Sequence, residues 1–284
     1  MNLINNKSTR WLAPAKLNLF LHITSRRTDG YHNLQTIFQF IDYCDVLYFK
    51  TRTDGQLSCQ STEKSLRPEQ DLVWQAARLL QTDSGTSLGA DIRVEKKIPM
   101  GGGLGGGSSD AATTLLALNQ LWQLEWPQTK LAEIGLSLGA DVPVFVHGQA
   151  AYAEGVGESL IPIEELKEPW YLVIHPDCHV STAEIFSAPD LTRDQIPVTI
   201  RAFFAGHCQN ICEPVVRSRY PQIGQALDWL NQFRPARLTG TGACLFAAFE
   251  SEAAANAVLA QLPSQWHGFV ALGKNISPAL FTNN

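Results

Sequence analysis

Six of the seven residues from 101 to 107 are glycine, and the seventh is Leu104. The run lies between a strand-like segment, residues 90–98, and a segment whose apolar residues recur at helical spacing. Glycines that lead into a helix N-terminus expose backbone N–H groups where the helix dipole adds partial positive charge. This stretch therefore predicts an anion site, and the number of glycines favours a polyphosphate.

The residues after the glycines predict where the helix begins. Ser108, Ser109 and Asp110 are side chains typical of a helix start, so we expect the helix to begin near Ser109. Its expected buried face consists of residues at helical spacing: Ala111, Leu115, Leu118 and Trp122.

Three other interpretations of the glycine run fit less well. A flexible linker mixes glycine with polar residues and joins domains, whereas this run joins two regular elements. A Walker loop needs Gly-Lys-Ser/Thr after the glycines, and no lysine follows here. A dinucleotide-binding motif needs G-x-G-x-x-G in a βαβ unit and an acidic residue ending the next strand, which this segment matches only in part.

Composition narrows the class of protein. The chain has 284 residues, 45% hydrophobic and 17% charged, with a formal net charge of −5, which argues against a general nucleic-acid or membrane-surface binder. Its six cysteines are scattered without C-x-x-C pairs, so we expect reduced thiols and no zinc site, although Cys208 and Cys212 lie beside His207. No run approaches a membrane span, and we expect a cytoplasmic protein.

Two N-terminal segments carry candidate site residues. Apolar and other residues alternate over 17–23, which predicts a strand with one buried face, and Lys16 and Asn18 lie two apart on it. Taken alone, these two are best interpreted as solvated polar residues. The Asp-Gly turn within 26–32 brings Tyr31 and His32 side by side, either to stack on a flat ring or as half-buried packing.

A third candidate is Asp141, the one acid in an apolar segment that we expect to be a turn and strand, residues 139–146. Its carboxylate either caps the local backbone or is a reactive group in a partly dry site. His147 follows on an apolar run, and we expect a structural role for it. Further strands are expected at 34–42, 46–51, 150–163 (a hairpin), 170–175 and 268–272, and a second glycine turn is expected to enter a buried strand within 238–249. Further helices are expected at 71–81, 129–138, 181–186, 199–205, 221–233 and 252–262.

Three segments together resemble the three motifs of the GHMP small-molecule kinases. They are residues 14–21 (PAKLNLFL), 99–109 (PMGGGLGGGSS) and 238–244 (LTGTGAC). The resemblance implies an α+β chain with the two-domain GHMP kinase fold, in which a ribosomal-protein-S5-like α/β domain precedes an α+β domain. The charged connection at 164–169 favours domains at 1–166 and 167–284.

Three shorter segments, DGYH at 29–32, GADVPVF at 139–145 and AEGVG at 153–157, resemble one branch of this superfamily. That branch uses ATP to phosphorylate a tertiary hydroxyl of a methylerythritol linked to cytidine diphosphate, in non-mevalonate isoprenoid synthesis. The resemblance implies Lys16 and Asp141 as the catalytic pair, with Mg²⁺ required. The residues that it places on the substrate side are Asn18, Tyr31, His32, Phe186, Thr239 and Gly240. The residues that it places at the bound ATP are Pro99, Met100, Gly101, Gly102, Gly103, Leu104, Gly105, Gly106, Gly107, Ser108 and Ser109.

The sequence matches only part of the set of protein ligands that the resemblance implies for Mg²⁺. Relatives hold Mg²⁺ with a serine and a glutamate; Ser108 or Ser109 fits the serine, with Ser108 the expected ligand, and no glutamate of this chain matches. Two alternatives stay open: another GHMP kinase, of the homoserine or phosphomevalonate type, and a nucleotide-binding sensor without catalysis. Tyr31 argues against the first alternative, because those substrates have no base on which an aromatic ring could stack. The presence of both Lys16 and Asp141 argues against the second, because a protein that only binds nucleotide does not need this pair.

Overall fold

The computed structural model describes residues 8–62 and 70–281. Its strands form one ten-stranded sheet in the order β3-β4-β2-β10-β7-β9-β8, with β1 and β5 also paired to β2 and β6 paired to β5. The strands are β1 (Thr9–Arg26), β2 (His32–Arg52), β3 (Leu57–Ser61), β4 (Gly89–Glu95), β5 (Ala151–Glu154), β6 (Ser159–Pro162), β7 (Trp170–His175), β8 (Ala236–Leu238), β9 (Leu245–Phe249) and β10 (His267–Lys274).

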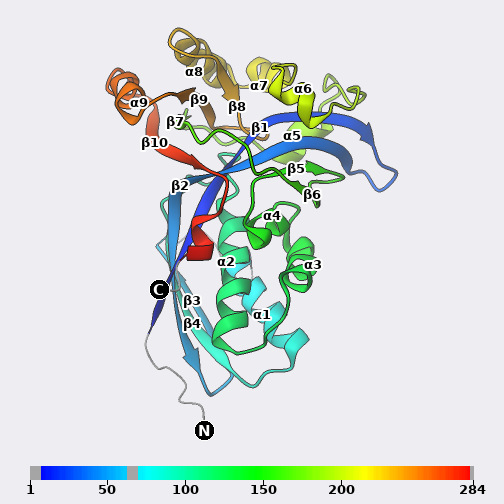
Figure 1. Ribbon diagram of the computed structural model, residues 1–284, viewed down its shortest axis with the longest axis vertical. Coiled ribbons are helices and arrows are strands. Elements are labelled where there is room, and N and C mark those ends of the chain that lie inside the picture. Colours follow the sequence, from blue (N-terminus) through cyan, green and yellow to red (C-terminus); the bar gives the residue numbers. More distant parts are fainter. Residues whose placement is uncertain (1–7, 63–69, 282–284) are drawn as a thin grey trace.

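The helices gather in two groups, one in each lobe of the molecule (Figure 1). The first group is α1 (Leu72–Ser84), α2 (Gly106–Leu121), α3 (Gln128–Leu138) and α4 (Val142–His147). The second is α5 (Thr182–Ser187), α6 (Ile200–Phe204), α7 (Glu213–Arg219), α8 (Pro221–Asn231) and α9 (Glu252–Leu259), and a 3₁₀ turn, η2, spans Pro278–Phe281. No helix of the described ranges is long and apolar enough to cross a membrane.

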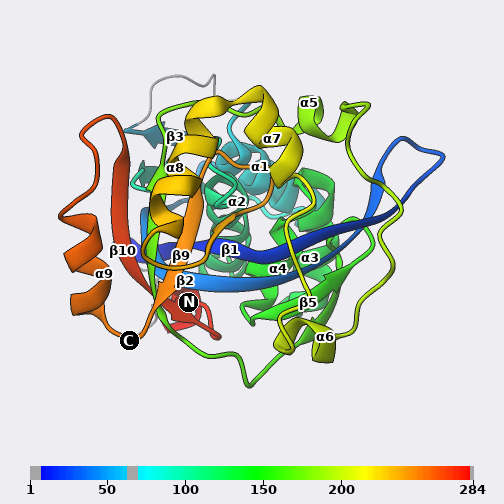
Figure 2. The same ribbon diagram turned by 90° about the horizontal axis from the view of Figure 1, so that it is seen from above.

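Strands β1 and β2 form a long antiparallel pair that belongs to both lobes (Figures 1 and 2). Toward one end of the pair, β2 also binds β4. Near its middle, Ile41 and Phe40 of β2 pair with Gly273 and Lys274 of β10, which joins the sheet of the second lobe. Both lobes therefore share one pair of strands.

Each lobe has its own apolar core, and a third cluster lies between them. The first core packs helices α1 to α4 on the sheet, with Phe49, Leu80 and Leu118 fully buried. The second packs β7 to β9 against helices α7 to α9. The third combines residues of β1, such as Leu17, with residues of β7, such as Val173, so the two lobes bury apolar surface against each other.

The structure corrects the expected strands near the N-terminus. β1 was expected to bury one face; instead Leu17, Leu19 and Phe20 are all buried, so both faces are covered. Lys16 and Asn18 are buried as well, at 3% and 4% exposure, so their interpretation as solvated residues is wrong. The two strands expected at 34–42 and 46–51 are one continuous strand, β2.

Three further expectations differ from the structure. The helix after the glycine run begins at Gly106, three residues before the expected start, with Gly105 as its N-cap. The segment after Asp141 is the short helix α4 and not a strand, with a proline in its first turn, where proline is well tolerated. Strands β3 and β8 and helix α7 were not expected at all.

The other expected elements are confirmed, with end shifts of a few residues. Among them are helix α1, which Asp71 caps by accepting from the Val73 N–H, and the hairpin of β5 and β6. The expected apolar face of α2 is buried along Ala111, Leu115, Leu118 and Trp122. The domain boundary at 166/167 stays a prediction.

Candidate active site

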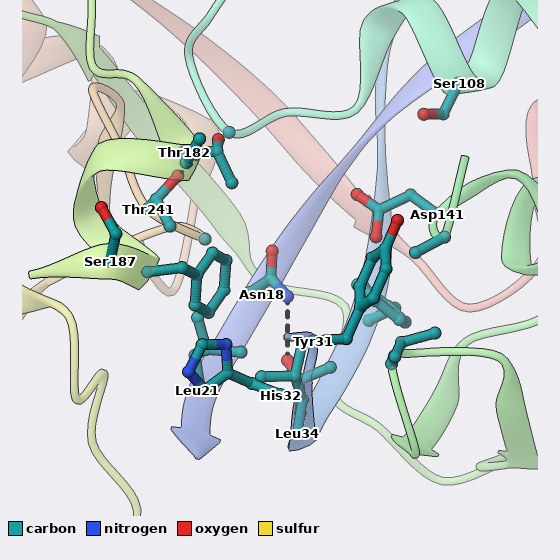
Figure 3. Close-up of a pocket in the computed structure, with 18 of the residues that line it drawn as sticks. Asn18, Leu21, Tyr31, His32, Leu34, Ser108, Asp141, Thr182, Ser187 and Thr241 are labelled. Atoms are coloured by element: carbon teal, nitrogen blue, oxygen red, sulfur yellow. Dashed lines mark hydrogen bonds between the residues drawn. The ribbon is translucent and has the colours of Figure 1, made fainter. Parts of the chain in front are cut away.

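A cavity of about 810 Å³ lies where the two lobes meet. β1 and β2, the glycine loop and the start of α4 line one part of it, and α5 with the turn before β9 lines another. Figure 3 shows Asn18, His32 and Asp141 around it. The residues that line the cavity are Lys16, Asn18, Leu21, Arg26, Asp29, Gly30, Tyr31, His32, Leu34, Thr36, Phe38, Gly103, Ser108, Ala140, Asp141, Val156, Thr182, Ala183, Phe186, Ser187, Gly240 and Thr241.

Lys16 is a buried cation whose amino group has two oxygen partners. Its Nζ donates to Asn18 Oδ1 at 2.5 Å and lies 3.1 Å from Asp141 Oδ2. The same atom lies 5.2 Å from the centre of the Phe38 ring, within the range of a cation–π contact. Burying an ammonium group is costly unless it is paired and hydrogen-bonded, and these contacts supply both conditions.

Asp141 combines one buried partner with access to the cavity. It is the N-cap residue of α4, but its side chain makes no capping hydrogen bond, so the interpretation as a local backbone cap is wrong. The carboxylate instead meets Lys16, while the side chain remains 32% exposed. A carboxylate in this position can accept a proton from a hydroxyl group bound in the cavity.

Asn18 is held rigidly between both lobes. Its Nδ2 donates to Thr36 Oγ1 at 3.0 Å, and Thr36 in turn donates to the carbonyl of Phe20. Its backbone N–H donates to Thr239 Oγ1 at 2.9 Å, a contact across 221 positions of sequence. The amide oxygen of Asn18, which accepts from Lys16, therefore has a fixed direction.

Backbone hydrogen bonds bring the three expected motifs together. The N–H of Lys16 donates to the carbonyl of Leu104 at 2.9 Å, which joins the first motif to the glycine loop. The N–H groups of Ala243 and Cys244 donate to the carbonyls of Gly101 and Gly102, which joins the third motif to the same loop. The loop is therefore a fixed wall and not a flexible connection.

Two loop positions require glycine for measurable reasons. Gly103 has φ +75°, and an added Cβ would lie 2.4 Å from the carbonyl oxygen of Thr239. Gly105 has φ +72°, and an added Cβ would lie 2.8 Å from the Phe145 ring and 3.1 Å from Cε of Lys16. These glycines permit left-handed backbone and close packing against the catalytic candidates.

The end of the loop presents the N-terminus of α2 without a side-chain cap. The free N–H groups of this first turn and the helix dipole favour an anion there. Of the eleven residues expected at the ATP, Gly103 and Ser108 line the cavity. Ser109 does not: its side chain is fully buried within α2 and its Oγ has no hydrogen-bond partner among the described residues.

A charged cluster supports the strand end that leads into the loop, and the sequence analysis missed it. The buried Asp45 accepts from the N–H groups of Lys97 and Ile98 and from Nζ of Lys96. Lys96 Nζ also donates to Asp110 at 2.6 Å. Burial raises the pKa of Asp110, the carboxyl group that shares Lys96 with Asp45. Lys96 lies only a few residues before the first glycine of the run, Gly101, so its position next to the glycines was the available signal.

The aromatic residues expected at the substrate all line the cavity. Tyr31 is 65% exposed, an unusual state for a large aromatic residue on a cavity wall. His32 is buried at 8%, and its ring stacks on Phe186 with a centroid separation of 5.4 Å and an interplanar angle of 22°. The adjacent pair therefore separates into one free ring and one packed ring.

The remaining predicted residues fall into two groups. Gly240 lines the cavity, whereas Thr239 is fully buried beneath it and contacts Asn18. Thr182 and Thr241, which share a hydrogen bond of 3.0 Å, also line the cavity and were not expected there. Thr241 follows Gly240 within the third motif, so its place in that motif was the available signal.

Comparisons with known proteins agree with this geometry. Family models described as GHMP kinases N terminal domain and GHMP kinases C terminal match residues 71–149 and 198–268. The 4-diphosphocytidyl-2-C-methyl-D-erythritol kinase of Nitrosococcus oceani is 58% identical, over 94% of this chain and 95% of its own length. The kinase of the same name from Shewanella loihica is 54% identical over 96% of each chain.

Solved structures show the same relationship. A crystal structure of 4-(cytidine 5'-diphospho)-2C-methyl-D-erythritol kinase superposes with a TM-score of 0.82 at 31% identity, covering 94% of this chain and 99% of that one. A mevalonate kinase, at 16% identity and a TM-score of 0.71 over 94% and 99% of the two chains, shares the fold. The two-domain GHMP kinase fold is confirmed, and the chain belongs to the GHMP kinase superfamily, in the family of the 4-diphosphocytidyl-2-C-methyl-D-erythritol kinases.

Proposed function

We propose that the protein transfers the γ-phosphoryl group of ATP to the 2-hydroxyl of 4-diphosphocytidyl-2-C-methyl-D-erythritol, in non-mevalonate isoprenoid precursor synthesis. The observation that carries this proposal is the contact of 3.1 Å between Lys16 and Asp141 on the wall of a cavity that also contains an exposed aromatic ring, Tyr31. The relatives named above support the substrate.

Three parts of the site have separate roles in the proposed reaction: Asp141, Lys16, and the glycine loop with the N-terminus of α2. The hydroxyl oxygen of the substrate forms a bond to the γ-phosphorus as the bond to the bridging oxygen of ADP breaks, and Asp141 accepts the hydroxyl proton. Lys16 orients that carboxylate and offsets negative charge near the transferred group. Gly103, Ser108 and the N-terminus of α2 supply N–H groups and a dipole at the phosphates.

Mg²⁺ would be held through hard oxygen ligands, and the hydroxyl of Ser108, which lines the cavity, offers one. Within the described ranges no group of three or more His, Cys, Asp or Glu side chains is arranged around a metal position, so phosphate and water oxygens would complete the shell, as Mg²⁺ prefers. The ion, when bound to ATP, neutralises charge on the phosphates.

The test is an ADP-release assay with ATP and Mg²⁺ on a panel of alcohols. The panel contains methylerythritol with and without the cytidine diphosphate group, homoserine and phosphomevalonate. We expect turnover only with the cytidyl compound. Turnover of homoserine or phosphomevalonate would assign another GHMP kinase activity, and stabilisation by ATP without turnover of any alcohol would assign a nucleotide sensor.

A further inference from the structure

Arg193 lies outside the cavity but contacts a residue that lines it. Its Nε donates to Nε2 of His32 at 3.1 Å. Its two other nitrogens donate to backbone carbonyls at the end of α5 and just after it, those of Phe186, Ala188 and Leu191, at 2.6 to 2.9 Å. Four hydrogen bonds therefore hold the guanidinium group in one orientation against the imidazole.

This contact determines where the proton of His32 resides. A guanidinium group has five N–H donors and no acceptor, so the imidazole nitrogen that it meets must offer a lone pair. Nε2 of His32 is consequently unprotonated, and the proton of the neutral ring is on Nδ1. A doubly protonated ring would direct an N–H group at Arg193 and place two positive charges in contact.

His32 lines the cavity, and its Nε2 edge and one of its faces are already occupied. Phe186 covers one face of the His32 ring, and Arg193 occupies its Nε2 edge. Figure 3 shows the ring below Asn18, on the opposite side of the view from the ring of Tyr31 and from Asp141. Nδ1 is then the ring nitrogen available to a bound ligand, and it is a donor.

We propose that Arg193 is a positioning residue that fixes His32 as the Nδ1–H tautomer and thereby makes the base site select cytosine over uracil. N3 of cytosine is an acceptor and matches the Nδ1–H group. N3 of uracil carries a hydrogen, so two donors would face each other and both would lose their partners. This inference rests on the proposed function, which places a cytidyl group in the cavity.

A purely structural role for Arg193 is the competing explanation, and the chain offers a matched control. Arg219 anchors the same segment through Glu184 at 3.6 Å and Asp190 at 3.0 Å, and neither contact involves His32. Arg193→Met and Arg219→Met each remove one arginine that ties down this segment. Arg193→Lys keeps a charged donor near Nε2.

The direct experiment is ¹⁵N–¹H correlation spectroscopy of the histidine rings in the full-length protein, with His32 assigned by loss of its signals in His32→Gln. We expect a protonated Nδ1 and an unprotonated Nε2 in the wild type and in Arg219→Met. Arg193→Met should shift the ring toward the Nε2–H form. A protonated Nε2 in the wild type overturns the proposal. Because the wild-type spectrum alone shows the tautomer of His32, this test holds even if a variant fails to fold.

The second readout is the ratio of kcat/KM for the cytidyl substrate to that for its uridyl analogue. We expect Arg193→Met to lower this ratio at least tenfold, mainly through KM of the cytidyl substrate, with KM for ATP within twofold of the wild-type value. Arg193→Lys should restore part of the ratio, and Arg219→Met should keep it. An unchanged ratio in a folded Arg193→Met protein overturns the selection role. If the wild type turns over neither compound, the proposed function fails, while the spectrum still decides the tautomer.

Discussion

Lys16 and Asn18 illustrate what can and cannot be predicted at the scale of residues. Their spacing indicated that they share a face of a strand, and the family resemblance indicated that they are functional. The pattern around them did not indicate burial, because the alternation of β1 describes one face only, while packing of the second lobe covers the other. Contacts that need a fold to exist, such as Asn18 to Thr239 and Arg193 to His32, have no signal in local sequence.

Asp141→Asn tests whether the carboxylate accepts a proton, because the asparagine side chain has nearly the same size and shape. The amide oxygen can still accept a hydrogen bond from Lys16, but the amide group cannot take the hydroxyl proton. We expect kcat to fall on the order of 10²- to 10⁴-fold, with little change in ATP affinity. Steady-state kinetics and nucleotide titration measure both quantities. A near-normal kcat would exclude Asp141 as the base, and loss of folding would indicate that the ion pair with Lys16 is chiefly structural.

Tyr31→Ala tests the exposed ring as a platform for the base. Because the side chain is 65% exposed, we expect stability to stay within about 0.5 kcal/mol of the wild type. Binding of the cytidyl substrate should weaken by roughly 1–3 kcal/mol, the range for stacking of a base on an aromatic ring. Tyr31→Phe is the control and should bind nearly as well as the wild type. Equal affinity of the alanine variant would show that the ring does not contact the base.

The charge of Arg193 has a consequence for the titration of His32. Burial first, and then the charges of Arg193 and Arg26, lower the pKa of His32 from 6.5. Arg193→Met should therefore raise this pKa, which an NMR titration of the ring measures, whereas Arg219→Met should not. Because the unfolded chain binds this proton near pH 6.5 and the folded chain only at lower pH, protonation of His32 favours unfolding as pH falls below 6.5. A lower or unchanged pKa in Arg193→Met would contradict the assigned contact.

At the scale of elements, helices and strands with clear periodicity and caps were predictable, and those with mixed signals were not. The run Val-Pro-Val-Phe-Val after Asp141 has the composition of a strand, yet it is helix α4, where the proline in the first turn was the competing signal. The helix start at Gly106 was missed because glycine is a poor helix former, and here the loop geometry outweighs propensity. Strand β3 is short and partly exposed, so its pattern is weak.

The glycine loop gives a prediction at this scale. Gly105→Ala introduces a Cβ at positive φ against Phe145 and Lys16, so we expect lower stability, a lower kcat and a raised KM for both substrates. Gly224→Ala is the control: the atoms nearest to its Cβ would be those of Arg217, at 3.8 Å, its backbone is helical in α8, and it does not line the cavity. We expect that variant to keep its melting temperature and its KM for ATP. Similar effects of both changes would contradict the role assigned to loop conformation.

At the scale of the whole molecule, the family resemblance predicted the architecture, whereas composition and periodicity alone indicated only a mixed α and β protein. They could not show that β1 and β2 serve both lobes, because strand pairing over long sequence separations leaves no local pattern. The pairing of Gly273 with Ile41 is an example.

This shared pair of strands predicts that the lobes unfold together. The apolar cluster between them contains Leu104 of the glycine loop and Val173 of β7, one from each lobe, so unfolding of one lobe exposes apolar surface of the other. We expect one thermal transition whose calorimetric and van't Hoff enthalpies agree. Differential scanning calorimetry measures both, and two separate transitions would show that the lobes are independent.

The cavity wall also combines residues that lie far apart along the chain. Asn18 donates through its backbone N–H to Thr239, and Thr241 is the residue farthest along the sequence that lines the cavity. β10, which follows still later, pairs with β2 from the beginning of the chain. A chain cut before Thr239 therefore contains Lys16 and Asp141 but lacks part of the cavity wall.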